Sequence, residues 1–490
     1  MHNSSTHPAV AAVGGVAQIV QRPGASELMR AHGPIELMVE ACHGAAVDAG
    51  APALLNKVGF VGVAGGWFRY QNPAQLVAER IGSPNATTAL TAVSGTGPQD
   101  LLGLAAERIA SGQLDVALIV GGEARWSHQR IKRAGSDPVW LTDPGLGTPE
   151  ALSAFPDVMV EEAIGLGSPA TSYALFEDSL RFSRGRSVSE HRDYIAALWA
   201  SFSAVGATNV HAWDRNAHSA KDIREPSREN RMISFPYTKA MVANNTVDMA
   251  SAILVCSVDA ARASGMNIDK LVFPHVVTSS HETWRIVERN RLHGCPALTT
   301  AGRAAFTHSG LGPDDFEHID LYACFPAIVQ MSSDALGIDS TRPLTVTGGL
   351  GFAGAPVGNA VGHSIATMTE RVRSSGIGFV HGNGGQATKH SFAVYASKPP
   401  KSFARIDVQA HVDHQSRAVQ PEDWAGPITV EAATVIYGRE GQSLVLAAVL
   451  NHAGQRGWGR STDPQIMTEA EAHGIAGRVG SRSADGRLDL

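Results

Sequence analysis

Short apolar runs alternate with helical patterns over residues 8–124. The apolar runs have the length of buried strands and read VAAVGGVAQIV, VGFVGVAG, TALTAV and DVALIVGG. The segments between them include IELMVEACHGAAVDAG and PAQLVAERIG, in which apolar residues recur at helical spacing. Strands that alternate with helices indicate βαβ units, so we expect a mainly parallel sheet.

Residues 125–240 interrupt this pattern with stretches rich in Pro, Trp, Arg and His, and we interpret them as an inserted loop domain. The alternation returns over residues 241–397, through MASAILVCS, HIDLYACF, LTVTGGL and IGFVHGNGG. A linker with Pro and Lys then precedes residues 404–490. There the strand-like runs ITVEAATVIYG and QSLVLAAVLNH and the helix-like DPQIMTEAEAHG predict a small β-barrel-like domain.

The composition suits a compact α/β protein and narrows the classes of partner. The 490 residues include 51 glycines, while 18% are charged and 6% aromatic, as expected of buried strands with small-residue turns. The net charge of −6 favours neither nucleic acid nor an anionic membrane as the main partner. No apolar stretch reaches the roughly 18 residues of a membrane span, and the N-terminal segment lacks a signal-peptide pattern. The four cysteines form no CxxC pair, which favours a reducing, cytoplasmic location and predicts no metal centre.

Two segments far apart in the chain are similar to each other. RIASGQLDVALIVGGEA at 108–124 parallels RVRSSGIGFVHGNGGQA at 371–387, since each has a helix end, a Ser-Gly stop, an apolar strand and a Gly-Gly exit. A glycine-rich corner precedes each, SGTGPQ in the first and GGLGFAGAPVGN in the second. Two similar halves would bring these corners together at the carboxyl ends of their strands, where α/β sheets place ligand sites.

Over residues 8–397 these segments resemble the thiolase superfamily. Its V-C-G-S-G-L-Q corner matches Val93-Ser94-Gly95-Thr96-Gly97-Pro98-Gln99, and its GGxE strand exit matches GGEA at 121–124. Its later motifs fall on Tyr322-Ala323-Cys324-Phe325, on GGLGFAGAP at 348–356 and on His381-Gly382-Asn383-Gly384-Gly385. The resemblance implies two similar βαβαβ halves in a layered α-β-α-β-α core, with an inserted loop domain between them.

The residue types at the family's catalytic positions are mostly changed. The nucleophilic cysteine position holds Ser94, the GHP histidine position holds Ala355, and the second cysteine position holds His381. The position that helps to bind the thioester oxygen holds Tyr322. We therefore take Ser94, His381 and Tyr322 as candidate catalytic residues.

A serine hydroxyl needs a hydrogen-bonded general base, and His381 could supply one if it faced Ser94. Backbone N–H groups near Gly95, Asn383 and Gly384 could form an oxyanion hole for a thioester carbonyl without any of the changed side chains. Together with Ala355, these residues are our candidates for the CoA-thioester site. Ser94 has a simpler interpretation as a small residue in a tight corner.

One group of thiolase-like proteins has an extra C-terminal domain and lacks the usual catalytic Cys and His, and it is commonly classed with acetyl-CoA acetyltransferases. By resemblance to that group, we expect an acyltransferase-like protein that takes a CoA thioester as substrate or ligand and needs no other cofactor. One alternative is a protein that binds acyl-CoA or lipid without chemistry. Thiolases are usually dimers, but an added domain could block that contact, so both a homodimer and a monomer remain open.

A second alternative is a nucleotide-dependent oxidoreductase. Gly349-Leu350-Gly351-Phe352-Ala353-Gly354 matches G-x-G-x-x-G after the predicted strand LTVTG, and Glu370 follows at the distance of a ribose-binding acid, although within a helical stretch. Two further features can be interpreted as either structural or functional. Arg181, Arg184 and Arg186 could meet CoA phosphates or form a solvated helix face, and Cys324 suits a buried core thiol.

Overall fold

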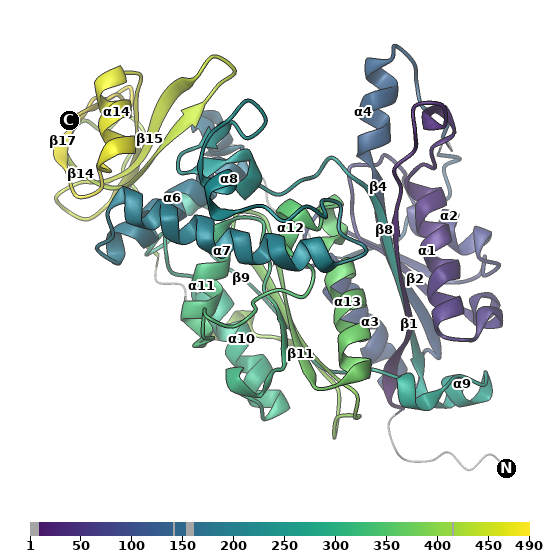
Figure 1. The fold of residues 1–490 in the computed structure, drawn as a ribbon. Helices are drawn as coiled ribbons and strands as arrows, with labels where there is room; N and C mark the ends of the chain where they lie inside the picture. The colour runs from purple at the N-terminus through teal and green to yellow at the C-terminus, as the bar shows by residue number, and fades with distance from the viewer. Residues whose placement is uncertain (1–8, 141–142, 153–160, 414–415) are drawn as a thin grey trace.

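The first sheet forms the half of the molecule nearest the N-terminus (Figure 1). In this computed structural model, which describes residues 9–140, 143–152, 161–413 and 416–490, the strand order is β1-β8-β4-β2-β3-β5. Its strands are β1 (Ala11–Val20), β2 (Phe60–Val63), β3 (Thr87–Thr91), β4 (Val116–Ala124), β5 (Glu150–Leu152) and β8 (Asp248–Ser257). β2 pairs in parallel with β3 and β4, whereas β8 runs antiparallel between β1 and β4.

The second sheet repeats this arrangement in the order β10-β11-β12-β9-β13. Its strands are β9 (Phe273–His281), β10 (His318–Asp320), β11 (Ile377–Gly384), β12 (Lys389–Ala396) and β13 (Ala404–Asp407). The run β10-β11-β12-β9 corresponds to β2-β4-β8-β1, and β12 is antiparallel between its neighbours as β8 is. Two similar halves are therefore present, as the internal repeat predicts.

Helices separate and cover the two sheets, which gives the predicted α-β-α-β-α layering. On the outer face of the first sheet lie α1 (Pro34–Asp48) and α2 (Pro73–Arg80). Between the sheets lie α3 (Gly97–Ala110) and α13 (Ala360–Ser374), and on the outer face of the second lie α10 (Pro296–Ser309) and α11 (Pro326–Leu336). The short α9 (Val258–Ala263) follows β8. The central helices α3 and α13 each begin just after a glycine-rich corner, so both corners end up at the middle of the molecule.

The inserted segment is mostly helical. It comprises α4 (Arg125–Arg133), α6 (Pro169–Ser183), α7 (Val188–Thr208), α8 (Ala220–Arg224), β6 (Met232–Ser234) and β7 (Tyr237–Thr238). α6 packs on α11, and α7 packs on the short α12 (Gly349–Phe352) and on α11. A capping box between Ser187 and Glu190 fixes the start of α7. Among the described residues no helix is long and apolar enough to cross a membrane.

The C-terminal unit contains β14 (Gly426–Tyr437), β15 (Gln442–Leu450), β16 (Arg456–Ser461), α14 (Pro464–Ala472), β17 (Val479–Arg482) and β18 (Leu488–Asp489). The order β16-β15-β14-β17-β18 is completed by a bridge between Arg460 and Arg487, which brings its two edges together. A separate apolar cluster fills its interior. This closed five-stranded arrangement with one helix has the strand connections of an OB-fold barrel.

Two predicted boundaries and one predicted strand differ from the structure. β8 was counted with the second half, yet it lies in the first sheet, because its apolar run pairs along its full length with β1 and β4. β13 was counted with the small β domain, yet it pairs with β9. The run LTVTGGL is not a strand, since the Asp320 carboxylate accepts the backbone N–H groups of Val346 and Thr347, each at 3.1 Å, in place of a neighbouring strand.

Candidate functional site

Two glycine-rich corners meet at the centre of the molecule. One is the turn between β3 and α3, and the other is the glycine-rich end of β11, which is distinct from the corner that precedes α13. A Cβ atom on Gly95 would overlap the Asn383 carbonyl oxygen and would lie 2.6 Å from the Tyr322 hydroxyl oxygen. A Cβ atom on Gly384 would overlap the Ser94 hydroxyl oxygen. Only glycine permits so close an approach of two backbones, so both positions require it.

The Ser94 hydroxyl is part of a short hydrogen-bonded relay. Ser94 is 2% exposed, and its Oγ lies 2.9 Å from Thr96 Oγ1. Thr96 Oγ1 donates to Asp100 Oδ2 at 2.9 Å, so its own hydrogen is committed and the Ser94 hydroxyl is the donor to Thr96. The Thr96 backbone N–H in turn donates to Ser94 Oγ at 3.2 Å. The relay therefore runs from the buried corner to Asp100 in the first turn of α3.

Asp100 has the properties of a proton acceptor. Burial raises the pKa of its carboxyl above the ordinary value, while the positive charges of Lys389 and Arg405 and the hydrogen bond from Thr96 lower it and Asp407 raises it. A carboxylate with a raised pKa is the usual form of a general base that works near neutral pH. Sequence reasoning missed Thr96 and Asp100, although a Thr at the start of a helix followed four residues later by Asp was visible in the corner motif.

His381 does not meet Ser94. Side chains alternate along a strand, and Gly382 and Gly384 face the corner, so His381 points to the opposite face of the second sheet. There its ring stacks on Phe392 with centroids 4.4 Å apart, and its Nε2 lies 3.2 Å from His390 Nδ1. Burial and the neighbouring His390 hold the pKa of His381 well below its ordinary value. The proposed Ser94–His381 pair is thus not formed.

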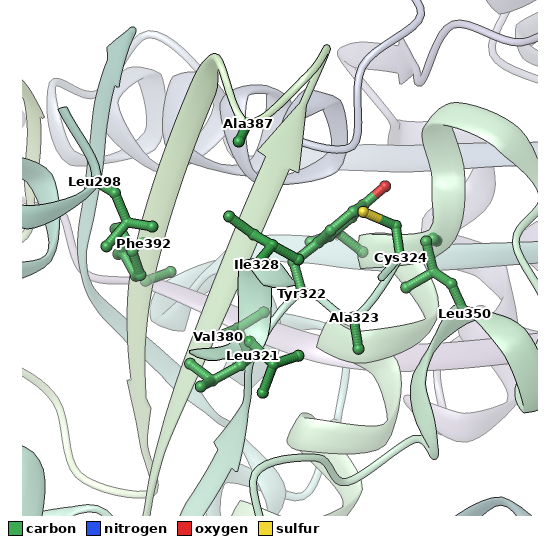
Figure 2. Packing of buried hydrophobic residues seen from close by; sticks show 14 of the residues in the cluster. Leu298, Leu321, Tyr322, Ala323, Cys324, Ile328, Leu350, Val380, Ala387 and Phe392 are labelled. Carbon is green, nitrogen blue, oxygen red and sulfur yellow. The ribbon is translucent and has the colours of Figure 1, made fainter. Parts of the chain in front are cut away.

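Tyr322 closes the corner from the side of the second sheet. It follows β10 in a buried run with Leu321, Ala323 and Cys324, shown in Figure 2. Its ring lies against Gly95 and edge-on to His381, with ring centroids 6.4 Å apart. Burial raises the pKa of the Tyr322 hydroxyl, so it keeps its proton and acts as a hydrogen-bond donor.

Asn383 and Ala355 occupy different parts of the site. The Asn383 side chain turns away from Ser94 and donates to Tyr173 Oη at 2.8 Å, while its carbonyl oxygen faces Gly95. Ala355 is buried, and its N–H donates to the Asn244 carbonyl at 3.0 Å. The backbone of Asn383 therefore belongs to the corner, whereas its side chain belongs to the core behind it.

The N–H groups of Ser94 and Gly95 have no hydrogen-bond acceptor among the described residues. Within the part of the chain that the structure describes, neither donates to a backbone carbonyl or to a side chain, whereas the next N–H groups, of Thr96 and Gly97, are both used. Paired backbone donors beside a buried hydroxyl are the arrangement that stabilises a developing oxyanion. Their position at the start of α3 adds the favourable end of the helix dipole.

The motifs that suggested other ligands have structural roles. A Cβ on Gly349 would lie 2.8 Å from the Phe202 ring of α7, so the G-x-G-x-x-G segment is covered by a helix, and no strand precedes it. Glu370 lies within α13, as its helical setting predicts. Arg181 pairs with Asp178 at 2.8 Å, Arg184 with Asp334, and the Arg186 guanidinium lies 3.9 Å from the Tyr194 ring centroid.

Cys324 is a core thiol, because burial raises its pKa to about 12. No group of three His, Cys, Asp or Glu side chains among the described residues could hold a metal ion. A separate cavity of about 910 Å³ lies at the end of β4 and is lined by Trp67, Arg125 and the Glu123 of the GGEA motif. Burial raises the pKa of Glu123 to about 7.

Solved structures share this fold, although neither a protein-family model nor a curated protein matches the sequence. A monomeric SCP2-thiolase-like protein type 1 from Mycobacterium smegmatis is 28% identical, with a TM-score of 0.84 over 99% of this chain and 100% of that chain. An acetyl-CoA acetyltransferase from Syntrophomonas wolfei is 15% identical, with a TM-score of 0.56 over 80% of this chain and 100% of its own. The dimeric peroxisomal thiolase of Saccharomyces cerevisiae is 12% identical, with a TM-score of 0.57 over 80% of this chain and 99% of its own. The chain therefore has a thiolase-like fold.

Proposed function

We propose that this protein binds a CoA thioester where the two glycine corners meet and transfers its acyl group. The observation that carries the proposal is the close approach of Gly95 to Asn383 and of Gly384 to Ser94, beside two N–H groups that have no acceptor among the described residues. The thiolase-like fold supports it, because similar structures include an acetyl-CoA acetyltransferase and a thiolase.

In this proposal the backbone binds the thioester carbonyl. The N–H groups of Ser94 and Gly95 donate to its oxygen, and the Tyr322 hydroxyl adds a third donor from the opposite side. Such donors stabilise the tetrahedral intermediate more strongly than the planar ester, because negative charge develops on the oxygen only during attack.

The acyl acceptor in this proposal is Ser94. Its proton passes to Thr96 while the Thr96 proton passes to Asp100, and the oxygen of Ser94 forms a bond to the carbonyl carbon. The bond from that carbon to the CoA sulfur then breaks, and the departing thiolate takes up the proton that Asp100 received, which returns through Thr96. This route replaces the missing histidine with a carboxylate, which uses hydrogen bonds already present in the structure.

A second candidate function is binding without chemistry. Ser94 is only 2% exposed and the Tyr322 ring lies against Gly95, so the hydroxyl has little contact with solvent. The two functions differ in one measurable respect, since only the enzyme releases free CoA from its ester.

Ligand-induced stabilisation tests the proposal, because a ligand that binds only the folded protein raises its melting temperature. We expect acetyl-CoA to raise the Tm, and NAD and NADP to leave it unchanged. Release of the CoA thiol, followed with a chromogenic thiol reagent, then separates acyl transfer from simple binding. Stabilisation by NAD or NADP alone, with none by CoA esters, would reject the acyl-CoA proposal.

A further inference from the structure

A second chemical group lies on the far side of the second sheet from Ser94. Cys295 is the residue that immediately precedes α10, and its Sγ lies 3.1 Å from His390 Nε2. His390 Nδ1 lies 3.2 Å from His381 Nε2, and His381 Nδ1 lies 3.3 Å from Ser332 Oγ. A nucleophile, a base and a group that orients the base thus follow one another, which is the arrangement of activated thiols and hydroxyls.

The direction of the hydrogen bonds follows from the last member of this chain. Ser332 Oγ donates to the Ile328 carbonyl at 2.7 Å, which is shorter than its contact with His381. His381 Nδ1–H is therefore the donor to Ser332, and His381 Nε2 accepts from His390 Nδ1–H. His390 Nε2 then faces both the Cys295 thiol, at 3.1 Å, and the Ala387 carbonyl oxygen, at 3.2 Å, so this carbonyl accepts the N–H that forms when Nε2 takes up the thiol proton.

The thiol also has access to a ligand-sized space. Cys295 lines a cavity of about 440 Å³ together with Arg289, Gly294, Pro296 and Thr299. A cavity of this size suits a small-molecule site. All four cysteines belong to apolar clusters, but Cys42, Cys256 and Cys324 do not line this cavity, and for Cys42 and Cys256 burial alone raises the thiol pKa.

At rest both partners are neutral. Burial and the nearby Glu282 raise the pKa of the Cys295 thiol, while Arg289 and the Leu298 N–H lower it less. Burial lowers the pKa of His390 to about 4. The sulfur thus becomes a nucleophile only as its proton moves to His390 during attack, in the way a serine hydroxyl is activated.

We infer that Cys295 is an acyl-accepting thiol that takes an acyl group from a thioester entering this cavity. The Cys295 sulfur forms a bond to the carbonyl carbon while its proton passes to His390 Nε2. The bond between that carbon and the thioester sulfur then breaks, and the departing thiolate takes the proton back from His390. One thioester is exchanged for another, so no oxidant or further reactant is needed. The choice of a thioester as donor rests on the proposed function, whereas the position of the acceptor does not.

Mass mapping after incubation with acetyl-CoA, and in parallel with S-acetyl-N-acetylcysteamine, tests the inference. The second probe is a small thioester that carries no nucleotide and so does not depend on CoA binding. We expect one acetyl group on the peptide that contains Cys295, and we expect neutral hydroxylamine to remove it, as it removes thioesters but not serine esters. Cys295→Ser should lose the hydroxylamine-sensitive label, and His390→Gln should acquire it about 100-fold more slowly, since a general base contributes at least that much.

Cys256→Ser is the matched control and should be labelled at the wild-type rate. Each variant is used only if its Tm shows that it is folded. The inference is overturned if neither probe labels Cys295, or if Cys256→Ser slows labelling as much as His390→Gln does. Labelling by the small thioester without stabilisation by CoA esters would support Cys295 as the acceptor and reject the CoA-based function. Stabilisation by acetyl-CoA without a label at Cys295 would support the CoA-based function and reject Cys295 as the acceptor.

Discussion

Ser94 and His381 lie on opposite sides of strand β11, although their sequence motifs align with the two catalytic cysteines of thiolases. Ser94 contacts Gly384 on the side of α3, whereas His381 stacks on Phe392 on the side of α10 and α11. Each therefore has its own proton partner, Asp100 through Thr96 for Ser94 and His390 for His381. The two proposals therefore concern two separate places in the fold.

Asp100→Asn tests the relay behind Ser94. An amide keeps a hydrogen bond to Thr96 but cannot accept a proton, so we expect the release of CoA from acetyl-CoA to slow by about 100-fold or more while binding persists. Glu107→Gln, on the same helix and on the surface, is the control and should retain the wild-type rate. An unchanged rate in Asp100→Asn would remove the relay from the mechanism.

The pH dependence of the same reaction gives an independent test. Asp100 acts as a base only when ionised, and burial raises its pKa above the ordinary carboxyl value, so the rate should rise with pH through that raised pKa. Lys389, Arg405 and Asp407 face the same carboxyl and set how far it is raised. We expect this rise of the rate with pH to disappear in Asp100→Asn.

Tyr322→Phe removes one hydroxyl from the corner and keeps the ring over Gly95. If that hydroxyl donates to the thioester carbonyl, the variant should bind acetyl-CoA with a loss of about 1 kcal/mol, roughly a fivefold increase in Kd. Isothermal titration calorimetry measures this directly. Tyr194→Phe, in α7, is the matched control, and an equal loss in both variants would contradict the assignment.

Gly95→Ala should destabilise the fold through the contact between the two corners. The added methyl group meets the Asn383 carbonyl and the Tyr322 ring, so we expect the free energy of unfolding to fall by about 1–3 kcal/mol. Gly438→Ala adds the same methyl group where the nearest atoms lie 3.9 Å away and should change stability by about 0.5 kcal/mol at most. Urea unfolding measures both.

His363 should make the protein less stable in acid. Burial lowers the pKa of His363 to about 3, so this side chain is neutral in the folded state and binds a proton after unfolding. The unfolded state binds more protons between pH 6.5, the ordinary pKa of a histidine, and about 3, so stability should be lost as the pH falls through that window. In His363→Gln the unfolding free energy should depend less steeply on pH, by a slope that corresponds to at most one bound proton. Urea unfolding at several pH values measures this slope.

Periodicity and the internal repeat predicted βαβ units and two similar halves, because they reflect the burial of both faces of each sheet. The layered order of sheets and helices was expected from the resemblance to the thiolase superfamily. The run LTVTGGL was assigned wrongly, since an apolar run with β-branched residues does not reveal that Asp320 takes its N–H groups. The repeat pairs the corner before α3 with the segment before α13, and a Cβ on Gly358 of that segment would lie 3.4 Å from the Ser94 nitrogen. The contact with the end of β11 was expected from the resemblance, which suggested an oxyanion hole near Gly95, Asn383 and Gly384. The direction of His381 was not predicted, because a motif gives the position of a residue along a strand but a one-residue offset reverses the face it occupies.

Residues from three parts of the chain join at the C-terminal barrel. β6 of the inserted segment pairs with β14, and the buried Arg456 side chain donates to the carbonyls of Val287 and Asn290 while it pairs with Glu431. Just upstream, β13 covers the outer edge of β9. A truncation before Ala404 would therefore not release an independent module. It would bare a strand edge on the second sheet and leave a remnant prone to aggregate, so the chain must be studied at full length.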